Sequence, residues 1–345
     1  MRILHVLYSN SFSGAENVAI QIIENFKKSD NVYYCSPEGN ISSVLDRKGI
    51  QYLPVSTLCV KEMKRVINKV QPDIIHAHDF RASFISILST KTIPVVSHLH
   101  NNCPWLRKKC LKSYIFLYIA KKSKVILTVS RSVMNEYIFG ERFSSKTMIV
   151  GNPVDVNKIR EQRSKIQGKE SDIVFCGRLT EQKNPFLFLD IIKKLTCVFP
   201  GITAVMLGDG TLFDSVQKRI HELDLCENIK MLGFVENPIP LMAKSKVLVV
   251  TSSWEGFGLV AVEALSLGKP VVASNVGGLP DLINEKCGLI CETLSDYVDE
   301  ITKLLQIEQY YESKSIGANN RSEELSNIDR YIGTIKEAYF KASDR

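Results

Sequence analysis

Two glutamates with a glycine-rich turn between them are well placed in this sequence to bind a ligand. They are Glu255 and Glu263 in the segment EGFGLVAVE. An apolar run predicts a strand before Glu255, and helical spacing predicts a helix that contains Glu263. Gly256 and Gly258 would let backbone amides approach a ligand, and the start of a helix attracts phosphate. Because a carboxylate's two oxygens match paired hydroxyl groups, the segment predicts a site for a phosphate-bearing sugar; two solvated glutamates are the alternative.

A second candidate segment is GRLTEQKNP, from Gly177 to Pro185, which follows the strand pattern DIVFC. Asn184 is suited to cap a helix that begins at Pro185, so we expect Lys183 at the mouth of that helix. Arg178 is expected at the strand end. Both cations could then bind one diphosphate through charge-assisted hydrogen bonds of about 1.5 to 3 kcal/mol each. The alternative is a pair of solvated surface charges.

Two further turns are expected at strand ends of the same half of the chain. Gly208 and Gly210 follow ITAVML, and Phe234 and Val235 follow NIKML. Backbone groups in such turns could pair with the edge of a nucleotide base. Glycine-rich strand ends are also ordinary turns, so these segments support the prediction only together with their neighbours.

Histidines gather at the expected strand ends of the first half. We expect His76, His78 and His100 to end strands, and His98 lies two residues before His100, on the same face of its strand. A strand-end histidine is more often a packed structural residue than a catalytic one, and both interpretations stay open. His78 and the adjacent Asp79 are further candidates for a ligand site.

A basic stretch over residues 107–124 flanks the apolar segment SYIFLYIA. It predicts a helix that could bind an anionic membrane surface or a lipid-linked diphosphate, with each nearby basic residue adding about 1 kcal/mol. The alternative is a helix whose Ile115, Leu117 and Ile119 face a sheet while its lysines are solvated. We expect peripheral, salt-sensitive membrane binding.

The elements that must position these residues alternate between apolar, β-rich runs and longer amphipathic segments. RILHVLY, NVYYCS, DIIHAHD, IPVVSHL and KVILTVS form a first series, and DIVFCGRL, ITAVMLGDG, NIKMLGF, KVLVVTS and KPVVASN form a second. This order predicts an α/β fold of two doubly wound, Rossmann-like domains facing each other across a cleft. We expect the first domain at 1–152, joined by a returning helix at 327–345, and the second at 153–326.

Composition limits the class of protein. The chain has 345 residues, 45% of them apolar and 23% charged, with a formal net charge of +7. It contains no apolar run of the roughly eighteen residues that span a bilayer, and no signal-peptide pattern, so a cytoplasmic protein is expected. Nine cysteines at uneven spacing predict buried, reduced thiols, without disulfides or a metal site.

These motifs resemble the retaining glycosyltransferases of family 4, which have the GT-B fold. Over residues 171–291 the chain has GRLTEQKNP, LGDGTL, LGFVENP, EGFGLVAVEAL and GKPVVASNVGGLPDLI in the family's order. The first half is similar through FSGAENVAIQI, PDIIHAHDF, VVSHLHN and VGNPVD. The resemblance covers nearly the whole chain, and the two glutamates eight residues apart are its most specific part.

The resemblance implies roles for particular residues. Glu255 is expected to contact the donor sugar, Glu263 the ribose, and Arg178 with Lys183 the diphosphate. The amides around Phe257, Gly258, Leu259 and Val260 are expected at the donor phosphate or sugar. His100 matches a histidine that reaches the transferred sugar. Ser13 and Gly14 precede an expected helix whose N-terminus could bind phosphate or the acceptor. The family has two glycines here, so Ser13 is a departure that weakens the expected close backbone approach at this position.

The function expected from the resemblance is transfer of a sugar, with retention, from a nucleotide sugar to a hydroxyl group. A UDP-sugar donor and a glycan or lipid-linked acceptor of a bacterial surface polysaccharide are expected, with no nucleic acid. No cofactor or metal is expected, because the family needs none and the chain has no Asp-x-Asp motif.

Other functions fit the residues less well. A nucleotide-sugar epimerase on the same scaffold is the main alternative, but it requires acid and base groups for which there is no convincing set. A non-catalytic nucleotide-sugar binder is disfavoured by the presence of Arg178, Lys183, Glu255 and Glu263. An NAD-dependent dehydrogenase is disfavoured because the first strand is followed by SNSFSGAEN in place of GxGxxG.

Overall fold

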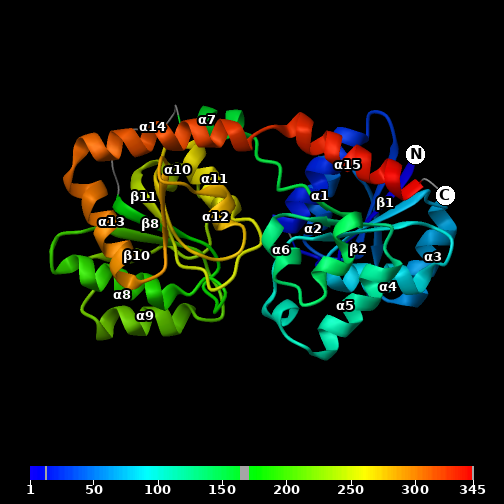
Figure 1. The fold of residues 1–345 in the computed structure, drawn as a ribbon, viewed down its shortest axis with the longest axis horizontal. Coiled ribbons are helices and arrows are strands. Elements are labelled where there is room, and N and C mark those ends of the chain that lie inside the picture. The colour runs from blue at the N-terminus through cyan, green and yellow to red at the C-terminus, as the bar shows by residue number, and fades with distance from the viewer. Residues whose placement is uncertain (12–13, 164–170, 344–345) are drawn as a thin grey trace. The chain divides into compact units, whose positions relative to one another are not determined.

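The computed structural model describes residues 1–11, 14–163 and 171–343, which divide into two compact units. The first unit comprises Met1–Pro153 and Ile328–Arg345, and the second comprises Val154–Asn327. Each unit is a parallel β-sheet with helices packed on it (Figure 1). The prediction of two Rossmann-like α/β domains is confirmed. None of the helices in the described part of the chain combines the length and apolar character that a membrane span requires.

The first unit has a seven-stranded sheet in the order β3-β2-β1-β4-β5-β6-β7. Its strands are β1 (Arg2–Val6), β2 (Asn31–Pro37), β3 (Gln51–Val55), β4 (Ile74–His78), β5 (Val95–Leu99), β6 (Val125–Thr128) and β7 (Thr147–Ile149). Its helices are α1 (Gly14–Phe26), α2 (Ile41–Arg47), α3 (Val60–Val70), α4 (Phe80–Ser89), α5 (Leu111–Lys122), α6 (Arg131–Asn135) and α15 (Ile328–Ser343), with 3-10 turns η1 (Pro104–Arg107) and η2 (Gly140–Lys146).

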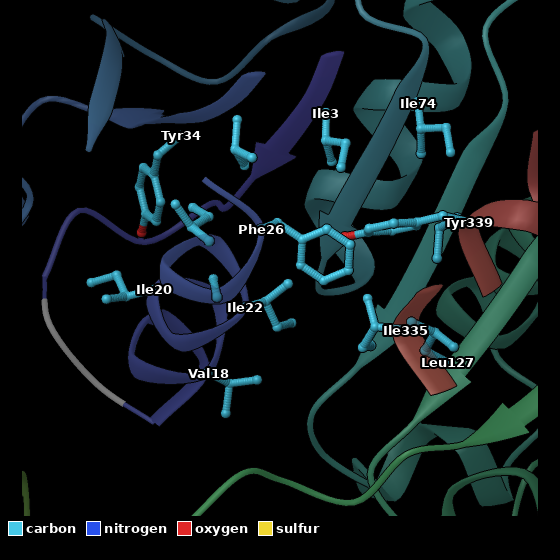
Figure 2. Packing of buried hydrophobic residues seen from close by; sticks show 14 of the residues in the cluster. Ile3, Val18, Ile20, Ile22, Phe26, Tyr34, Ile74, Leu127, Ile335 and Tyr339 are labelled. Carbon is cyan, nitrogen blue, oxygen red and sulfur yellow. The ribbon is translucent and has the colours of Figure 1, made fainter. Parts of the chain in front are cut away.

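The core of the first unit joins helices from both ends of the chain. Buried residues of α1, such as Ile22 and Phe26, share one apolar cluster with Ile335 and Tyr339 of α15 (Figure 2). The rings of Phe26 and Tyr339 meet edge to face at a centroid distance of 5.2 Å. The apolar spacing in the last segment therefore reflects a helix that packs in the first unit, next to the N-terminal strand and helix (Figure 1).

The second unit has a six-stranded sheet in the order β10-β9-β8-β11-β12-β13. Its strands are β8 (Ser171–Cys176), β9 (Ala204–Leu207), β10 (Ile229–Met231), β11 (Ser245–Val250), β12 (Val271–Ser274) and β13 (Gly288–Cys291). Its helices are α7 (Val156–Arg163), α8 (Pro185–Thr196), α9 (Phe213–Glu222), α10 (Ile239–Ala243), α11 (Leu259–Ser266), α12 (Leu279–Leu282), α13 (Leu294–Gln306) and α14 (Glu308–Leu325). β8 and β11 are central neighbours, which brings the segments after these two strands together.

Three strands were not expected from the sequence, and all three are edge strands. β3 and β7 end the first sheet, and β13 ends the second. An edge strand needs less apolar sequence than a central one, and β3 even contains Pro54, which lacks the N–H that a central strand must donate. Such strands give a weak sequence signal.

The prediction for the cysteines is partly wrong. All nine are free thiols, but only Cys35, Cys287 and Cys291 are buried. Cys197 and Cys226 are exposed, and the sulfur of Cys226 lies 3.1 Å from Nδ1 of His221. The two residues are five positions apart, and the turn that follows α9 brings their side chains together.

Candidate functional site

The carboxyl ends of β8 and β11 bring a lysine and a glutamate into direct contact. Lys183 forms an ion pair with Glu255, and the two side chains are only 17% and 12% exposed. The hydroxyl of Ser252 also donates to Glu255 at 3.3 Å. Since charge pairs strengthen where water is excluded, this pair is held more firmly than one on an open surface. The structure thus brings together two residues that are 72 positions apart in the chain.

Backbone capping fixes Lys183 at the start of α8. Asn184 has a left-handed backbone conformation with φ of 45°, its side chain accepts from the amide of Leu187, and Pro185 follows at the first helical position. The hydroxyl of Thr251 donates to the carbonyl groups of Lys183 and Asn184 at 2.9 and 3.0 Å. The predicted helix cap is confirmed, and the loop after β11 holds it in place.

Arg178 lies two residues beyond β8 and is linked to the same loop. Its guanidinium donates to Oε1 of Gln182 at 3.4 Å, and Gln182 in turn donates to the carbonyl of Trp254 at 3.2 Å. The amide of Ser253 donates to the carbonyl of Gln182 at 2.8 Å. Gln182 was not singled out from the sequence, because its value depends on which loop lies beside it.

Glu263 lies on α11, as expected, and is partly buried. Burial raises the pKa of Glu263 from 4.5 to about 7, and the nearby charge of Lys183 offsets part of that increase. Cys176 is half-buried, and desolvation raises the pKa of its thiol to about 12, with the charge of Glu263 as a second contribution. A carboxylate in this setting lacks sufficient solvation and gains from hydroxyl donors of a ligand.

The turn before α11 has a conformation that glycine alone adopts readily. Gly258 has φ of 101°, and an added Cβ would lie 2.7 Å from Cδ2 of Leu279. Gly258 is also the N-cap residue and provides no side-chain hydrogen bond to the first turn of the helix. Gly256 and Phe257 are buried. Leu259 and Val260 are half-buried at the start of the helix, where backbone amides point toward a potential anion.

The remaining loops of this edge are joined by backbone hydrogen bonds. The amide of Gly177 donates to Leu207 and that of Gly208 to Gly233, at 2.9 and 2.8 Å. A Cβ on Gly208 would lie 2.0 Å from the carbonyl oxygen of Gly177, so the two loops approach too closely for any side chain there. The structure therefore places the loops after β8, β9 and β10 side by side.

Other residues expected in these loops differ in exposure. Gly210 packs against Leu179, because an added Cβ would lie 2.4 Å from its carbonyl oxygen. Phe234 is 78% exposed and Val235 is half-buried, so their side chains lie at the surface of the unit.

A hollow of about 340 Å³ lies in the first unit, beside the ends of β4 and β5. Its lining includes Glu16, Asp79, His100, Trp105 and Lys112. Burial raises the pKa of Asp79 to about 6, although its carboxylate accepts from the amides of Ala82 and Tyr8 at 2.7 and 3.1 Å. Gly14 is exposed at the first position of α1, and Ser13 lies outside the described residues.

Glu16 and Trp105 were missed from the sequence. Glu16 lies in the first turn of α1 and is only 3% exposed. The available signal in the sequence was an acidic residue two positions after the start of an expected helix. Trp105 contacts the ring of Phe80 at a centroid distance of 5.0 Å, and a single aromatic residue in a loop gave no pattern to detect.

The expected position of His76 is wrong. His76 lies in the middle of β4 and is fully buried, whereas His78 ends that strand and His100 follows β5 directly. His98 and His100 do share a face, with ring centroids 4.0 Å apart. Buried neutral rings must have hydrogen-bond partners, and these rings are bonded mostly to one another.

Two groups of histidines are compact enough to surround a metal ion. One contains His5, His76 and His78 and the other contains His78, His98 and His100, with ring nitrogens of each group within 4.8 Å of one another. Most of these nitrogens already have hydrogen-bond partners in neighbouring rings or in Tyr339.

Helix α5 buries a different face from the one proposed as the alternative. Its buried residues are Ser113, Phe116, Ile119 and Ala120, so of the three aliphatic residues suggested to face the sheet only Ile119 is fully buried. Leu111, Tyr114 and Tyr118 are 76, 50 and 41% exposed and follow one another at helical spacing.

The fold and these sites define a two-domain α/β protein with clustered cations and carboxylates at the carboxyl edge of one Rossmann-like sheet. Residues 156–323 match the family described as Glycosyl transferases group 1, and residues 12–158 match Glycosyltransferase Family 4. The chain therefore belongs to the family 4 glycosyltransferases, enzymes with the GT-B fold.

Several relatives support this assignment. A UDP-Gal:alpha-D-GlcNAc-diphosphoundecaprenol alpha-1,3-galactosyltransferase of Escherichia coli is 28% identical over 376 residues, covering 98% of this chain and 96% of that protein. An uncharacterized glycosyltransferase of Methanocaldococcus jannaschii is 28% identical over 235 residues, but the match covers only 61% of this chain and 57% of that protein. The crystal structure of Anabaena HepE in complex with UDP-glucose has a TM-score of 0.85 at 21% identity, and the match covers 98% of each chain.

Proposed function

We propose that this enzyme transfers a sugar from a UDP-sugar to a hydroxyl group of a glycan or lipid-linked acceptor, with retention at the anomeric carbon and without a metal. The observation that carries the proposal is the contact of Lys183 with Glu255 at the carboxyl edge of the second sheet, next to Arg178 and Glu263. The galactosyltransferase of Escherichia coli acts with UDP-Gal, and HepE binds UDP-glucose. These relatives favour a uridine nucleotide as the donor here.

Binding of the donor would change the partners within this site. In the ligand-free protein, Glu255 neutralises Lys183. A diphosphate carries more negative charge than one carboxylate, so it would attract Lys183 and Arg178 and leave Glu255 to accept hydrogen bonds from the sugar. Glu263 would accept from the ribose hydroxyls, and these hydrogen bonds are stronger when it is ionised. The expected contacts of Gly177 and of the amides at 256–260 would complete the phosphate and sugar site.

The proposed reaction is a substitution on one face of the sugar. The bond from the anomeric carbon to the diphosphate oxygen breaks while the bond to the acceptor oxygen forms, and a phosphate oxygen of the leaving group takes the acceptor's proton. Negative charge grows on the diphosphate in the transition state. Arg178 and Lys183 stabilise that charge, and capping by Asn184 and Thr251 holds Lys183 in position before the reaction starts.

In the first unit, we propose that the hollow beside β4 and β5 serves the same reaction. His100 and Asp79 line it, which is consistent with a contact between His100 and the transferred sugar. Gly14, at the start of α1, would present a helix N-terminus to phosphate or acceptor.

We further propose that α5 binds an anionic membrane surface. Leu111, Tyr114 and Tyr118 form an exposed apolar row, and Lys112, Lys121 and Lys122 lie on the same helix. Apolar side chains between basic ones match the boundary between acyl chains and anionic head groups. This surface would bring the enzyme to a lipid-linked acceptor at the inner face of the membrane, consistent with the diphosphoundecaprenol acceptor named for the Escherichia coli relative.

A panel of nucleotide sugars tests the donor. The unfolding midpoint of the full chain would be measured with UDP-, GDP- and ADP-sugars in the presence of a chelator. A donor at 100 times its Kd stabilises the folded protein by about 2.7 kcal/mol, so we expect an increase with one UDP-sugar and none in a Lys183→Ala variant. A shift that needs a divalent metal, or that occurs only with another base, contradicts the proposal.

Incubation with donor alone separates transfer from epimerisation. A glycosyltransferase leaves the nucleotide sugar intact or hydrolyses it slowly. Recovery of an isomerised nucleotide sugar would favour the epimerase.

A further inference from the structure

Five of the six histidines of this chain lie in one file across neighbouring strands of the first sheet. The file, together with the tyrosine that it contacts, consists of His5, His76, His78, His98, His100 and Tyr339. His5 is in register with His76, and His78 with His98, so the rings occupy one face of the sheet. Burial lowers the pKa of each of the five rings, to about 3 for His5 and His100, and the file is therefore neutral at physiological pH.

Two branches of hydrogen bonds start at the hydroxyl of Tyr339. In the longer branch, this hydroxyl lies 3.5 Å from Nε2 of His5, and Nδ1 of His5 lies 2.8 Å from Nε2 of His78. Nδ1 of His78 then lies 3.0 Å from Nε2 of His100. In the shorter branch, the hydroxyl lies 2.7 Å from Nδ1 of His76, whose Nε2 lies 3.2 Å from Nδ1 of His98.

Each branch ends at a ring nitrogen with no partner in the described structure. These nitrogens are Nδ1 of His100 and Nε2 of His98. His100 lines the hollow beside β4 and β5, and its Nδ1 is a buried atom without a partner. A buried polar atom without a partner is costly, at about 1 to 3 kcal/mol, unless a ligand or water supplies the missing hydrogen bond.

The number of protons couples the two ends. Five neutral rings and one phenol carry six N–H or O–H protons, and the two branches contain five hydrogen bonds. If each bond uses one proton, a single proton is left, and it must sit at one free end. One end is then a donor and the other an acceptor, because Tyr339 has only one proton to give.

The two contact lengths at Tyr339 favour one of the two proton arrangements. Hydrogen bonds donated by O–H groups are typically about 2.7 to 2.8 Å long, and those donated by N–H groups are longer. The 2.7 Å contact therefore fits Tyr339 donating to His76, and the 3.5 Å contact fits a weak bond from His5 to the phenol oxygen. From these two directions, every ring in the file carries its proton on Nε2. Nδ1 of His100 is then an acceptor.

We propose that Tyr339 is a positioning residue that acts through His5 and His78 to keep Nδ1 of His100 unprotonated, as an acceptor for a hydroxyl group of the ligand. The inference rests on the proposed function for the identity of that ligand, the transferred sugar, but not for the proton arrangement itself. It assigns a role at the ligand site to a residue 239 positions away in the chain, on a helix that does not line the hollow.

The test is a measurement of histidine tautomers in the ligand-free protein. In protein with 15N-labelled histidine, long-range proton–nitrogen spectra distinguish protonated from unprotonated ring nitrogens, and exposed His221 provides an internal reference. In the wild type we expect all five buried rings to be protonated on Nε2. In Tyr339→Phe the anchor is lost, so His100 should populate the form protonated on Nδ1. A wild-type His100 protonated on Nδ1, or an unchanged His100 in Tyr339→Phe, overturns the proposal.

A matched variant separates this effect from general damage to the helix. Tyr331 is also buried on α15, and its hydroxyl has no partner in the described chain. Tyr331→Phe removes the same atom from the same helix and should leave all five tautomers unchanged. Equal tautomer changes in the two variants overturn the specific role of Tyr339.

Donor affinity then tests the ligand. Loss of one neutral hydrogen bond should weaken donor binding by about two- to tenfold in Tyr339→Phe, and not in Tyr331→Phe. If the tautomer changes while neither Tyr339→Phe nor His100→Ala alters donor binding, the ligand part of the proposal is overturned. The proposed function is tested separately by comparing donor binding in the wild type and in Lys183→Ala. Equal binding by these two proteins would contradict the proposed function, whatever the histidine tautomers are.

Discussion

Replacement of Glu263 by glutamine should stabilise the ligand-free enzyme at alkaline pH and weaken donor binding. Burial raises the pKa of this carboxyl from 4.5 to about 7, so the folded protein holds the proton more tightly than the unfolded chain. Stability from Glu263 is therefore greatest below pH of about 4.5 and is lost as the pH rises toward about 7. Glutamine has nearly the same shape and does not titrate, so its contribution to the free energy of unfolding should not change with pH.

The size of the effect follows from the shift. With the two pKa values above, the free energy of unfolding should fall by up to about 2.5 kcal/mol more in the wild type than in the variant between roughly pH 5 and pH 8. For a unit of this size, about 1 kcal/mol corresponds to roughly 2 to 4 °C in the unfolding midpoint. The midpoint of Glu263→Gln should thus exceed that of the wild type by several degrees at the higher pH, with little difference at the lower.

Calorimetry of the wild type, Glu263→Gln and Glu227→Gln at both pH values provides the measurement. Glu227 is an exposed glutamate of the same unit, and Glu227→Gln serves as the control for removal of a glutamate charge. Titration with the donor should show about tenfold weaker binding to Glu263→Gln at the higher pH, because a charged acceptor is lost. A stability difference that is the same at the two pH values would refute the reasoning from burial.

Four other changes test separate parts of the structure. Lys183→Ala should reduce turnover about a hundredfold or more in a transfer assay, by the loss of one preorganised cation at the leaving group. Gly258→Ala should lower the free energy of unfolding by about 1 to 3 kcal/mol in thermal melts, because its φ is 101°. Leu111→Ser should weaken binding to phosphatidylglycerol vesicles about tenfold in co-sedimentation, since one exposed apolar anchor is removed. Asp79→Asn should reduce the loss of stability as the pH rises from about 4 to about 6, because burial raises the pKa of Asp79 to about 6.

Lys183→Ala, Gly258→Ala and Leu111→Ser each have a matched control in the chain. Lys218→Ala removes an exposed lysine of the second unit, and Gly201→Ala adds a Cβ with no atom within 4 Å. Ile316→Ser removes an exposed apolar residue from a helix of the other unit. Effects of equal size in a variant and its control would contradict the role assigned to that residue. The membrane proposal for α5 is also contradicted if the wild type does not bind vesicles at low salt.

The sequence predicted the local setting of Lys183 and Glu255 but not their contact. The cap at Asn184 and the turn at Gly258 are local patterns, so the sequence predicts Lys183 at the mouth of a helix and Glu255 in the loop after a strand. Their pairing depends on β8 lying next to β11, which is a property of strand order that no local pattern contains. Gln182 was missed for the same reason.

The histidines illustrate the same limit in the first unit. The repeated spacing His-x-His predicted that His98 and His100 share a face, but His5, alone in the first strand, gave no signal. Its role depends on the register of β1 with β4. His76 was expected at a strand end because the end of an apolar run is difficult to locate to within two residues.

Placement of α15 in the first unit has a consequence for biosynthesis. Tyr339 and Ile335 fill the same core as Phe26, although the whole second unit lies between them in the chain. During translation the second unit can acquire all of its strands before the ribosome reaches residue 328, whereas the first unit waits with part of its apolar interior uncovered. The half that is made first must therefore be completed last, and nascent chains halted before that point should be the ones that chaperones retain.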